Sequence, residues 1–167
     1  MNKNERNEKI EEYGHGYEML ASSLDDVPRT AWEFKPLPQE WSVHEVIIHM
    51  ADAETVGAIR ARKLIAEPGS TIMPYDEAHW ADVLEYLNQS VDEALQIFKL
   101  TRQMTYKLLK AQPDQIFSHT VVHPQTVYPE YGEAYTLDKW LSIYTRHVRD
   151  HIKQIQDIFM AWNERNI

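Results

Sequence analysis

The sequence predicts an all-α protein, a four-helix bundle with a long crossover before the last helix. Apolar residues recur at steps of three and four along four long stretches, which is the spacing of one helix face. Proline and glycine gather between those stretches, where helices end. The 167 residues, 43% of them hydrophobic, suit one domain, and we expect residues 1–167 to form it because no repeat or composition break divides them.

The first predicted helix covers residues 4–24 and carries an apolar stripe at the helical spacing. Gly14 and Gly16 weaken it locally, each by up to about 1 kcal/mol relative to alanine. Residues 27–41 contain three prolines and form a connection that is extended in places, since a residue before proline avoids the helical region. We expect Trp32 to hold this connection against the bundle.

The second predicted helix, residues 42–66, begins at a capping box. In Ser42-Val43-His44-Glu45 the serine is the N-cap, and the glutamate three residues later completes the hydrogen bonding of the free amides. Pro68-Gly69 ends the helix. The residues expected to face inward are Val46, His49, Ala53, Val56 and Arg60.

The third predicted helix runs over residues 76–111, and a long link, residues 114–135, follows it. The apolar stripe expected on the buried side of this helix is Trp80, Leu84, Leu87, Val91, Leu95 and Phe98. Segment 117–122 of this link is a candidate short strand. So long an ordered link inside a compact domain often has a function. The fourth predicted helix, residues 136–162, begins at Thr136 as its cap, and its stripe is Trp140, Tyr144, His147, His151, Ile155, Ile158 and Trp162.

Composition narrows the classes of function. The chain has no cysteine, which excludes disulfides, thiolate metal sites and cysteine nucleophiles, so a metal site must use histidine, carboxylates and water. The net charge of -9 and the lack of a Lys/Arg run argue against nucleic acid as a partner. No stretch approaches the roughly 20 apolar residues of a membrane span, and the polar first residues lack a signal-peptide core. We therefore expect a soluble, cytoplasmic protein without membrane contact.

The histidines carry the clearest functional signal. His147 and His151 lie four residues apart, so both imidazoles leave the same helix face one turn apart and can reach one ion. Such a pair alone is weak evidence, because core hydrogen bonding or a surface position explains most of them. His49 lies on the inward stripe of another helix. Three histidines from two helices can hold an ion on one side and leave a position open, which is typical of catalytic sites. Nitrogen ligands suit Zn, Ni, Co, Fe or Mn.

Several short motifs follow one another along the chain. They are Trp41-Ser42, then His49-x-x-Asp52-x-Glu54 with Arg60, then Pro74-Tyr75-Asp76-Glu77-x-x-Trp80-Ala81, then His123-Pro124 and Gly132, and finally His147-x-x-x-His151-x-x-x-Ile155. Over nearly the whole chain this pattern resembles the DinB-like superfamily, and most closely its YfiT-like branch. The stretch between His123 and Gly132 is longer than in that branch, and we expect it to reshape the pocket.

The resemblance implies a four-helix bundle, often a homodimer, with a divalent metal on the residues that match His49, His147 and His151. Zn or Ni is expected before Fe, Mn or Co. Members of the family include metal-dependent hydrolases and enzymes that join low-molecular-weight thiols to electrophiles. The family name comes from DNA-damage induction and implies no contact with DNA.

Three further residues are candidate catalytic groups, and each has a plainer alternative. Glu54 is a candidate general base, or else a structural carboxylate. Arg60 is a candidate for binding an anionic substrate group, or else snorkels at the bundle end. His123 is a candidate for reaching the pocket from the long link, or else a surface histidine. Asp52, three residues after His49, either orients an imidazole or forms an ordinary surface salt bridge.

Two reactions need the same open coordination position. A metal on three neutral imidazoles lowers the pKa of a bound water towards about 7, which supplies hydroxide for a hydrolase. It can equally deprotonate a low-molecular-weight thiol for transfer to an electrophile. The sequence therefore predicts a metal-dependent enzyme that acts on a small molecule, either as a hydrolase or as a thiol transferase. The alternative is a non-catalytic metal- or small-molecule-binding bundle, and beyond that a structural protein with core histidines. Metal affinity is expected to fall below about pH 6.5, where free imidazole is protonated.

Overall fold

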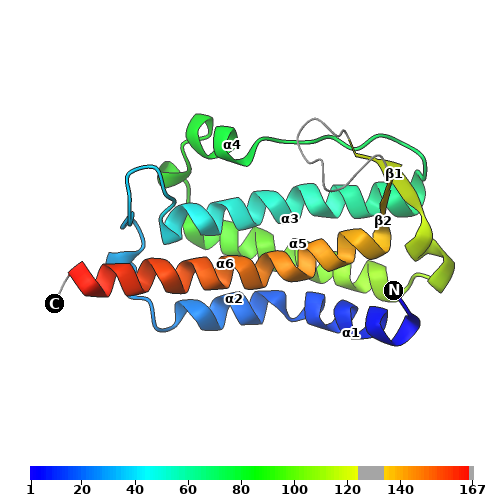
Figure 1. Cartoon of the computed structure of the whole chain (residues 1–167), viewed down its shortest axis with the longest axis horizontal. Helices are drawn as coiled ribbons and strands as arrows, with labels where there is room; N and C mark the ends of the chain where they lie inside the picture. Colours follow the sequence, from blue (N-terminus) through cyan, green and yellow to red (C-terminus); the bar gives the residue numbers. More distant parts are fainter. Residues whose placement is uncertain (124–133, 166–167) are drawn as a thin grey trace.

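The computed structural model describes residues 1–123 and 134–165, and its long helices run side by side along one axis (Figure 1). The bundle consists of α1 (Lys3–Gly14) continued by α2 (Gly16–Leu24), α3 (Val43–Ala66), α5 (Val91–Lys110) and α6 (Leu137–Arg165). The predicted all-α four-helix bundle is confirmed in this described part of the chain. None of the described helices carries an apolar run that would let it span a bilayer.

The first predicted helix divides at His15 into α1 and α2, because its two glycines lie against α5. A Cβ atom on Gly14 would stand 2.7 Å from a ring carbon of Tyr106, and one on Gly16 would overlap the guanidinium of Arg102. The missing side chains therefore allow a close approach that alanine would block. His15 itself has φ -83° and ψ 0°, which interrupts the helix for one residue.

The capping box predicted for α3 is present. The Ser42 side chain accepts a hydrogen bond from the Glu45 backbone N–H, and the Glu45 carboxylate accepts one from the Ser42 backbone N–H at 2.8 Å. The helix ends at Ala66, and Gly69 then adopts the left-handed conformation with φ +83°. Before α3, the short turn η1 (Arg29–Ala31) leads into Trp32, which is buried as expected.

The single helix predicted over residues 76–111 is wrong. The chain forms α4 (Glu77–Val83), the short turn η2 (Tyr86–Asn88) and only then α5. Glu85 takes the left-handed conformation with φ 49°, which no α-helix accommodates. A new helix starts at Ser90, whose side chain accepts a hydrogen bond from the Glu93 backbone N–H. Two residues of the expected stripe, Leu84 and Leu87, are consequently exposed.

This interruption changes the topology of the bundle. Residues 67–90 return the chain along the outside of α3, so α3 and α5 run in the same direction (Figure 1). A long connection also precedes α6, as predicted. It contains η3 (Asp114–Ser118), β1 (Thr120–Val122) and β2 (Ala134–Thr136).

The candidate strand over residues 117–122 begins only at Thr120, because Phe117 belongs to η3. β1 and β2 pair antiparallel, with Val121 opposite Tyr135. Thr136 caps α6 as predicted, since its Oγ1 accepts a hydrogen bond from the Lys139 backbone N–H at 3.1 Å. Residues 124–133 lie outside the described residues. They include Pro124, Gly132 and the lengthened stretch between His123 and Gly132.

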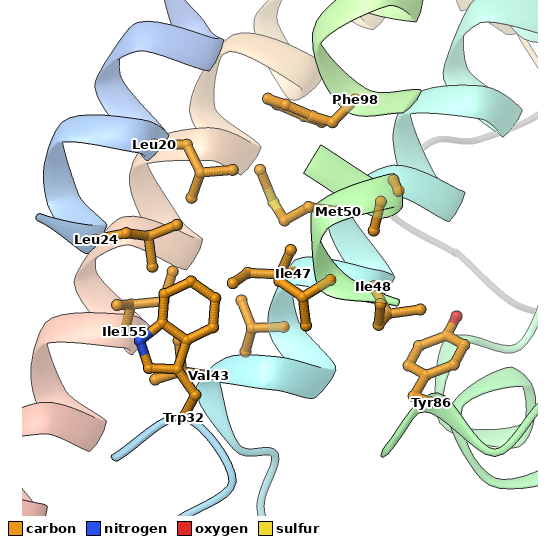
Figure 2. Close-up of a cluster of buried hydrophobic side chains, with 14 of the residues drawn as sticks. Leu20, Leu24, Trp32, Val43, Ile47, Ile48, Met50, Tyr86, Phe98 and Ile155 are labelled. Atoms are coloured by element: carbon orange, nitrogen blue, oxygen red, sulfur yellow. The ribbon is translucent and has the colours of Figure 1, made fainter. Parts of the chain in front are cut away.

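The apolar core has two parts with polar side chains between them. The first cluster includes Leu20, Trp32, Ile47, Phe98 and Ile155, which converge from several helices in Figure 2. The second cluster lies towards β1 and β2 and includes Tyr13, Leu64, Tyr135, Trp140 and Leu141. Along the helices, buried polar residues occupy the interval between the two clusters. We call Glu54, Arg102 and Thr145 the polar layer.

Candidate metal centre

Three imidazoles from two helices meet inside the bundle. α3 supplies His49, and two successive turns of α6 supply His147 and His151. Nε2 of His147 lies 3.2 Å from Nε2 of His49 and 3.0 Å from Nε2 of His151. One nitrogen from each ring lies within 4.8 Å of the other two, so the predicted trio is brought together. We call these residues the three-histidine group.

Two neighbours hold the rings of this group in place. The Trp41 ring packs 4.8 Å from the His49 ring, on the side where the chain enters α3. Nδ1–H of His151 donates a hydrogen bond to Oε1 of Gln154 at 2.8 Å. This bond leaves the Nε2 lone pair of His151 directed at the other two imidazoles. Among the described residues, the buried Nδ1 atom of His49 has no hydrogen-bond partner.

Burial keeps all three imidazoles neutral. It lowers the pKa of His49 to about 3, with a smaller contribution from the charge of His151. The pKa of His147 is also held well below its ordinary value, by burial first and then by its two histidine neighbours. Burial lowers the pKa of His151, against the opposing effect of its hydrogen bond to Gln154. Neutral imidazoles with convergent lone pairs are the form that binds transition metals, so this donor set fits such an ion.

A cavity opens beside the three-histidine group. It has a volume of about 590 Å³, which is within the range of small-molecule sites. It reaches from the connection before α3 to the C-terminal half of α6. Its lining is mixed in polarity and consists of Pro36, Gln39, Glu40, Trp41, His151, Gln154, Asp157, Ile158 and Ala161.

Comparison with known proteins decides the family. A family model described as the DinB superfamily matches residues 12–155. The chain belongs to the DinB superfamily. This confirms the resemblance that the ordered motifs indicated.

Proteins that are similar to this chain have names that refer to metal. "Putative metal-dependent hydrolase YfiT" of Bacillus subtilis (strain 168) is 28% identical over 125 residues, which cover 74% of this chain and 67% of that protein. A relative from Oceanobacillus iheyensis with the same functional name is 27% identical over 118 residues, covering 71% of this chain and 64% of the relative. The matched region thus spans about two thirds of each relative.

A solved structure supports the DinB-superfamily fold. YfiT from Bacillus subtilis, described as a "probable metal-dependent hydrolase with an unusual four-helix bundle topology", superposes with a TM-score of 0.84. The superposition covers 95% of this chain and 87% of that one, at 23% sequence identity. At this identity the likeness establishes the fold alone.

Glu77 is a neighbour of the three-histidine group that belongs to the motif Pro74-Tyr75-Asp76-Glu77 but was not predicted as a site residue. Its Oε2 lies 3.9 Å from Nε2 of His49, and its side chain is 39% exposed. The residue stands in the first turn of α4, whose N-cap Asp76 accepts a hydrogen bond from the His79 backbone N–H. The sequence predicted a helix start at Asp76-Glu77. The expected unbroken helix over residues 76–111 gave no indication that this start lies beside the three-histidine group.

Among the described residues, Asp52 contacts neither an imidazole nor a basic side chain. Its Oδ2 accepts a hydrogen bond at 2.6 Å from the hydroxyl of Tyr86, which η2 brings against α3. Partial burial raises the pKa of Asp52, and the hydrogen bond from Tyr86 opposes that rise. Asp52 therefore ties η2 to α3. The sequence did not reveal this role, because the prediction placed Tyr86 inside a single helix over residues 76–111, where the structure has η2.

Glu54 lies in the polar layer, where other side chains engage both of its carboxylate oxygens. The hydroxyl of Tyr13 donates to Oε1, and the Arg102 guanidinium pairs with Oε2 at 3.0 Å. Both partners of this ion pair are almost completely buried. These contacts favour the structural alternative for Glu54, and its role as a general base stays a prediction.

Arg60 and His123 are both buried, away from the bundle surface. The Arg60 guanidinium donates to the Met73 carbonyl oxygen at 2.9 Å and to the Tyr144 hydroxyl at 3.4 Å. His123 follows β1, and its ring lies 5.7 Å from that of Tyr135. It is therefore no surface histidine. Binding of an anionic group by Arg60 and access of His123 to the pocket remain predictions.

Proposed function

We propose that this protein is a metal-dependent enzyme whose ion is bound by His49, His147 and His151. The observation that carries the proposal is the convergence of three neutral imidazole nitrogens from α3 and α6, of which His49 is buried and the other two are partly buried. The names of similar proteins support metal dependence and hydrolysis. Three imidazole nitrogens that converge in this way are the donor set that one bound ion requires.

The donor set favours Zn or Ni, ahead of Co, Fe and Mn, because it offers borderline imidazole nitrogen and no thiolate. A bound ion would supply Lewis-acid chemistry, activating either water for hydrolysis or a thiol for transfer. Side chains of the protein orient and shield the histidine ligands. His151 is oriented by Gln154, and Trp41 shields the ring of His49 from solvent.

The cavity beside His151 is the proposed substrate site. Its polar lining, with Gln39, Glu40 and Asp157, favours a small polar molecule that is neutral or carries positive charge. Hydrolysis of such a molecule is the first candidate reaction. Transfer of a low-molecular-weight thiol uses the same open side of the three-histidine group and is the second candidate. Assays with ester, amide and thiol–electrophile pairs distinguish the two.

Elemental analysis tests the metal centre directly. The protein is purified without an affinity tag or chelator, together with His147→Ala and with His79→Ala, which removes an exposed histidine outside the group. About one transition-metal ion per chain is expected in wild type and His79→Ala and none in His147→Ala. Wild-type protein that holds no ion, even after addition of Zn²⁺ or Ni²⁺, would contradict the proposal and favour a non-catalytic bundle.

We propose further that the protein pairs with a second copy of itself through α5. Ile97, Leu100 and Met104 follow one another at steps of three and four on one face of that helix. Leu100 is 58% exposed and Met104 63% exposed, so the described part of the chain leaves this face largely uncovered. A row of exposed apolar side chains at the helical spacing is typical of a helix–helix interface.

Charge favours an antiparallel arrangement of the two copies. Glu93 and Lys107 are exposed and lie seven residues before and after Leu100, two turns away on the same face. With a two-fold axis at Leu100, Glu93 would face Lys107 of the partner subunit, and Ile97 would face Met104 of the partner subunit. A face that is complementary to itself in this way is what a two-fold dimer requires.

A further inference from the structure

α4 brings a carboxylate to the three-histidine group. The helix lies alongside the first half of α3 (Figure 1), and its first turn places Oε2 of Glu77 at 3.9 Å from Nε2 of His49. Among the described residues, no other carboxylate oxygen approaches an imidazole nitrogen of the group within 4 Å. A carboxylate has therefore been brought close to the His49 nitrogen of the three-histidine group.

The segment that carries Glu77 is fixed at both of its ends. On the N-terminal side, the Arg60 guanidinium of α3 donates a hydrogen bond to the Met73 carbonyl oxygen at 2.9 Å. On the C-terminal side, the hydroxyl of Tyr86 donates to Asp52 of α3 at 2.6 Å. Asp52 is on the same helix as His49, one turn further along. These contacts hold the segment that carries Glu77 beside the three-histidine group.

The distance indicates how the carboxylate acts. Oε2 of Glu77 lies 3.9 Å from Nε2 of His49, which is beyond hydrogen-bond distance, so the carboxylate does not bond to the imidazole itself. The carboxylate is therefore set back from the three nitrogens, at a position suited to hydrogen bonding with a molecule on their open side. The side chain remains 39% exposed, so such a molecule has access to it.

We propose that Glu77 accepts a hydrogen bond from the O–H, N–H or S–H group of the molecule that occupies the open side of the three-histidine group. The inference rests on the proposed metal centre and adds the residue that orients the bound molecule. It also predicts a preference for molecules that carry a hydrogen-bond donor next to the atom that contacts the ion. A charge-assisted bond of this kind is stronger than a neutral one.

Two small probes test this role on the zinc-loaded protein. Acetohydroxamate binds metal ions and carries an N–H donor, whereas azide binds metal ions and carries none. We expect Glu77→Ala to weaken acetohydroxamate binding about 10-fold or more and to leave azide binding no weaker than in wild type. Glu77→Gln, which keeps an acceptor oxygen without the charge, should lie between. Asp82→Asn removes an exposed charge from the same helix and should bind both probes like wild type.

Zinc content separates this inference from the proposed function. One zinc ion per chain is expected in both wild type and Glu77→Ala, because the three histidines are intact. Equal acetohydroxamate binding by wild type and Glu77→Ala would overturn the role of Glu77 and leave the metal centre in place. An equal loss of azide binding in Glu77→Ala would do the same. So would an equal loss of acetohydroxamate binding in Asp82→Asn. Loss of zinc from Glu77→Ala would make Glu77 a direct ligand, which also contradicts the proposal. A wild-type protein that binds no zinc would overturn both.

Discussion

At the scale of single residues, burial is what prepares the three histidines for metal. An exposed imidazole is half protonated near pH 6.5, and this value underlies the expectation that metal affinity falls below that pH. Burial lowers the pKa of His49, His147 and His151, so protons begin to compete with a metal ion only at lower pH. The sequence could not supply this correction, because it does not give the depth of each ring.

The same burial predicts that metal-free protein loses stability as the pH falls from 7.5 to 5.5. The folded chain keeps His49 neutral down to about pH 3, whereas the unfolded chain takes up a proton near pH 6.5. Between these values the unfolded state binds more protons, so the free energy of unfolding decreases with falling pH, by at most about 1.4 kcal/mol per unit for one histidine. Urea unfolding in the presence of a chelator measures this. A His49→Asn variant should show a shallower dependence, and a flat profile for wild type would disprove the effect.

The ion pair between Arg102 and Glu54 predicts a large loss when one partner is removed. Arg102→Met leaves the Glu54 carboxylate buried without its cation, and breaking a buried pair in this way costs about 3–5 kcal/mol. Urea unfolding at pH 7 checks the value. Lys110→Met, which breaks an exposed pair with Glu11, is the control and should change stability little. A small loss for Arg102→Met would show that Glu54 is free to act elsewhere, including as a general base.

At the scale of elements, local signals predicted most helix ends, and long-range contacts decided what they missed. Ser42 and Thr136 cap α3 and α6 as expected, because capping depends on residues within one turn. The break between α4 and α5 was missed although Ser90 and Glu93 have the spacing that identified Ser42 and Glu45. The apolar spacing continued across Leu84 and Leu87, and it indicated an unbroken helix more strongly than Ser90 indicated a new start. Sequence spacing likewise brought out His147 and His151, but Glu77 lies near His49 only because α4 folds back over α3.

The cap of α5 predicts a measurable local effect. Ser90→Ala removes the side chain that accepts a hydrogen bond from the Glu93 backbone N–H, which typically costs about 1 kcal/mol. Thermal or urea unfolding measures the difference. Ser22→Ala, an exposed position inside α2, is the matched control and should be neutral or slightly stabilising, because alanine is the better helix former. Equal effects of the two changes would argue against Ser90 as the functional start of α5.

At the scale of the whole molecule, the proposed dimer has a simple test. Leu100→Glu places a charge at the centre of the α5 face and would set like charges against each other across the two-fold axis. Light scattering coupled to size-exclusion chromatography is expected to show a dimer for wild type and a monomer for this variant. Leu84→Glu, at another exposed apolar position, should leave the dimer intact. A wild-type protein that elutes as a monomer at all concentrations would rule the interface out.

The charges beside that face provide a second, independent measurement. Glu93→Lys alone should weaken the dimer, because it would put two lysines opposite each other. The double change Glu93→Lys with Lys107→Glu should restore it, since the pairs are then exchanged. Failure of the double variant to recover would exclude the antiparallel pairing while leaving open another contact through Leu100.

His49 and His147 are 98 residues apart in a chain that has no cysteine. An ion shared by them would therefore act as the crosslink that disulfides supply in other proteins. In the disulfide case, closing a loop of about 100 residues is worth roughly 4–5 kcal/mol, because it limits the conformations of the unfolded chain. The supply of metal during synthesis would then govern how long each molecule escapes proteolysis. Scarcity of the ion would lower the amount of this protein in the cell as well as its activity.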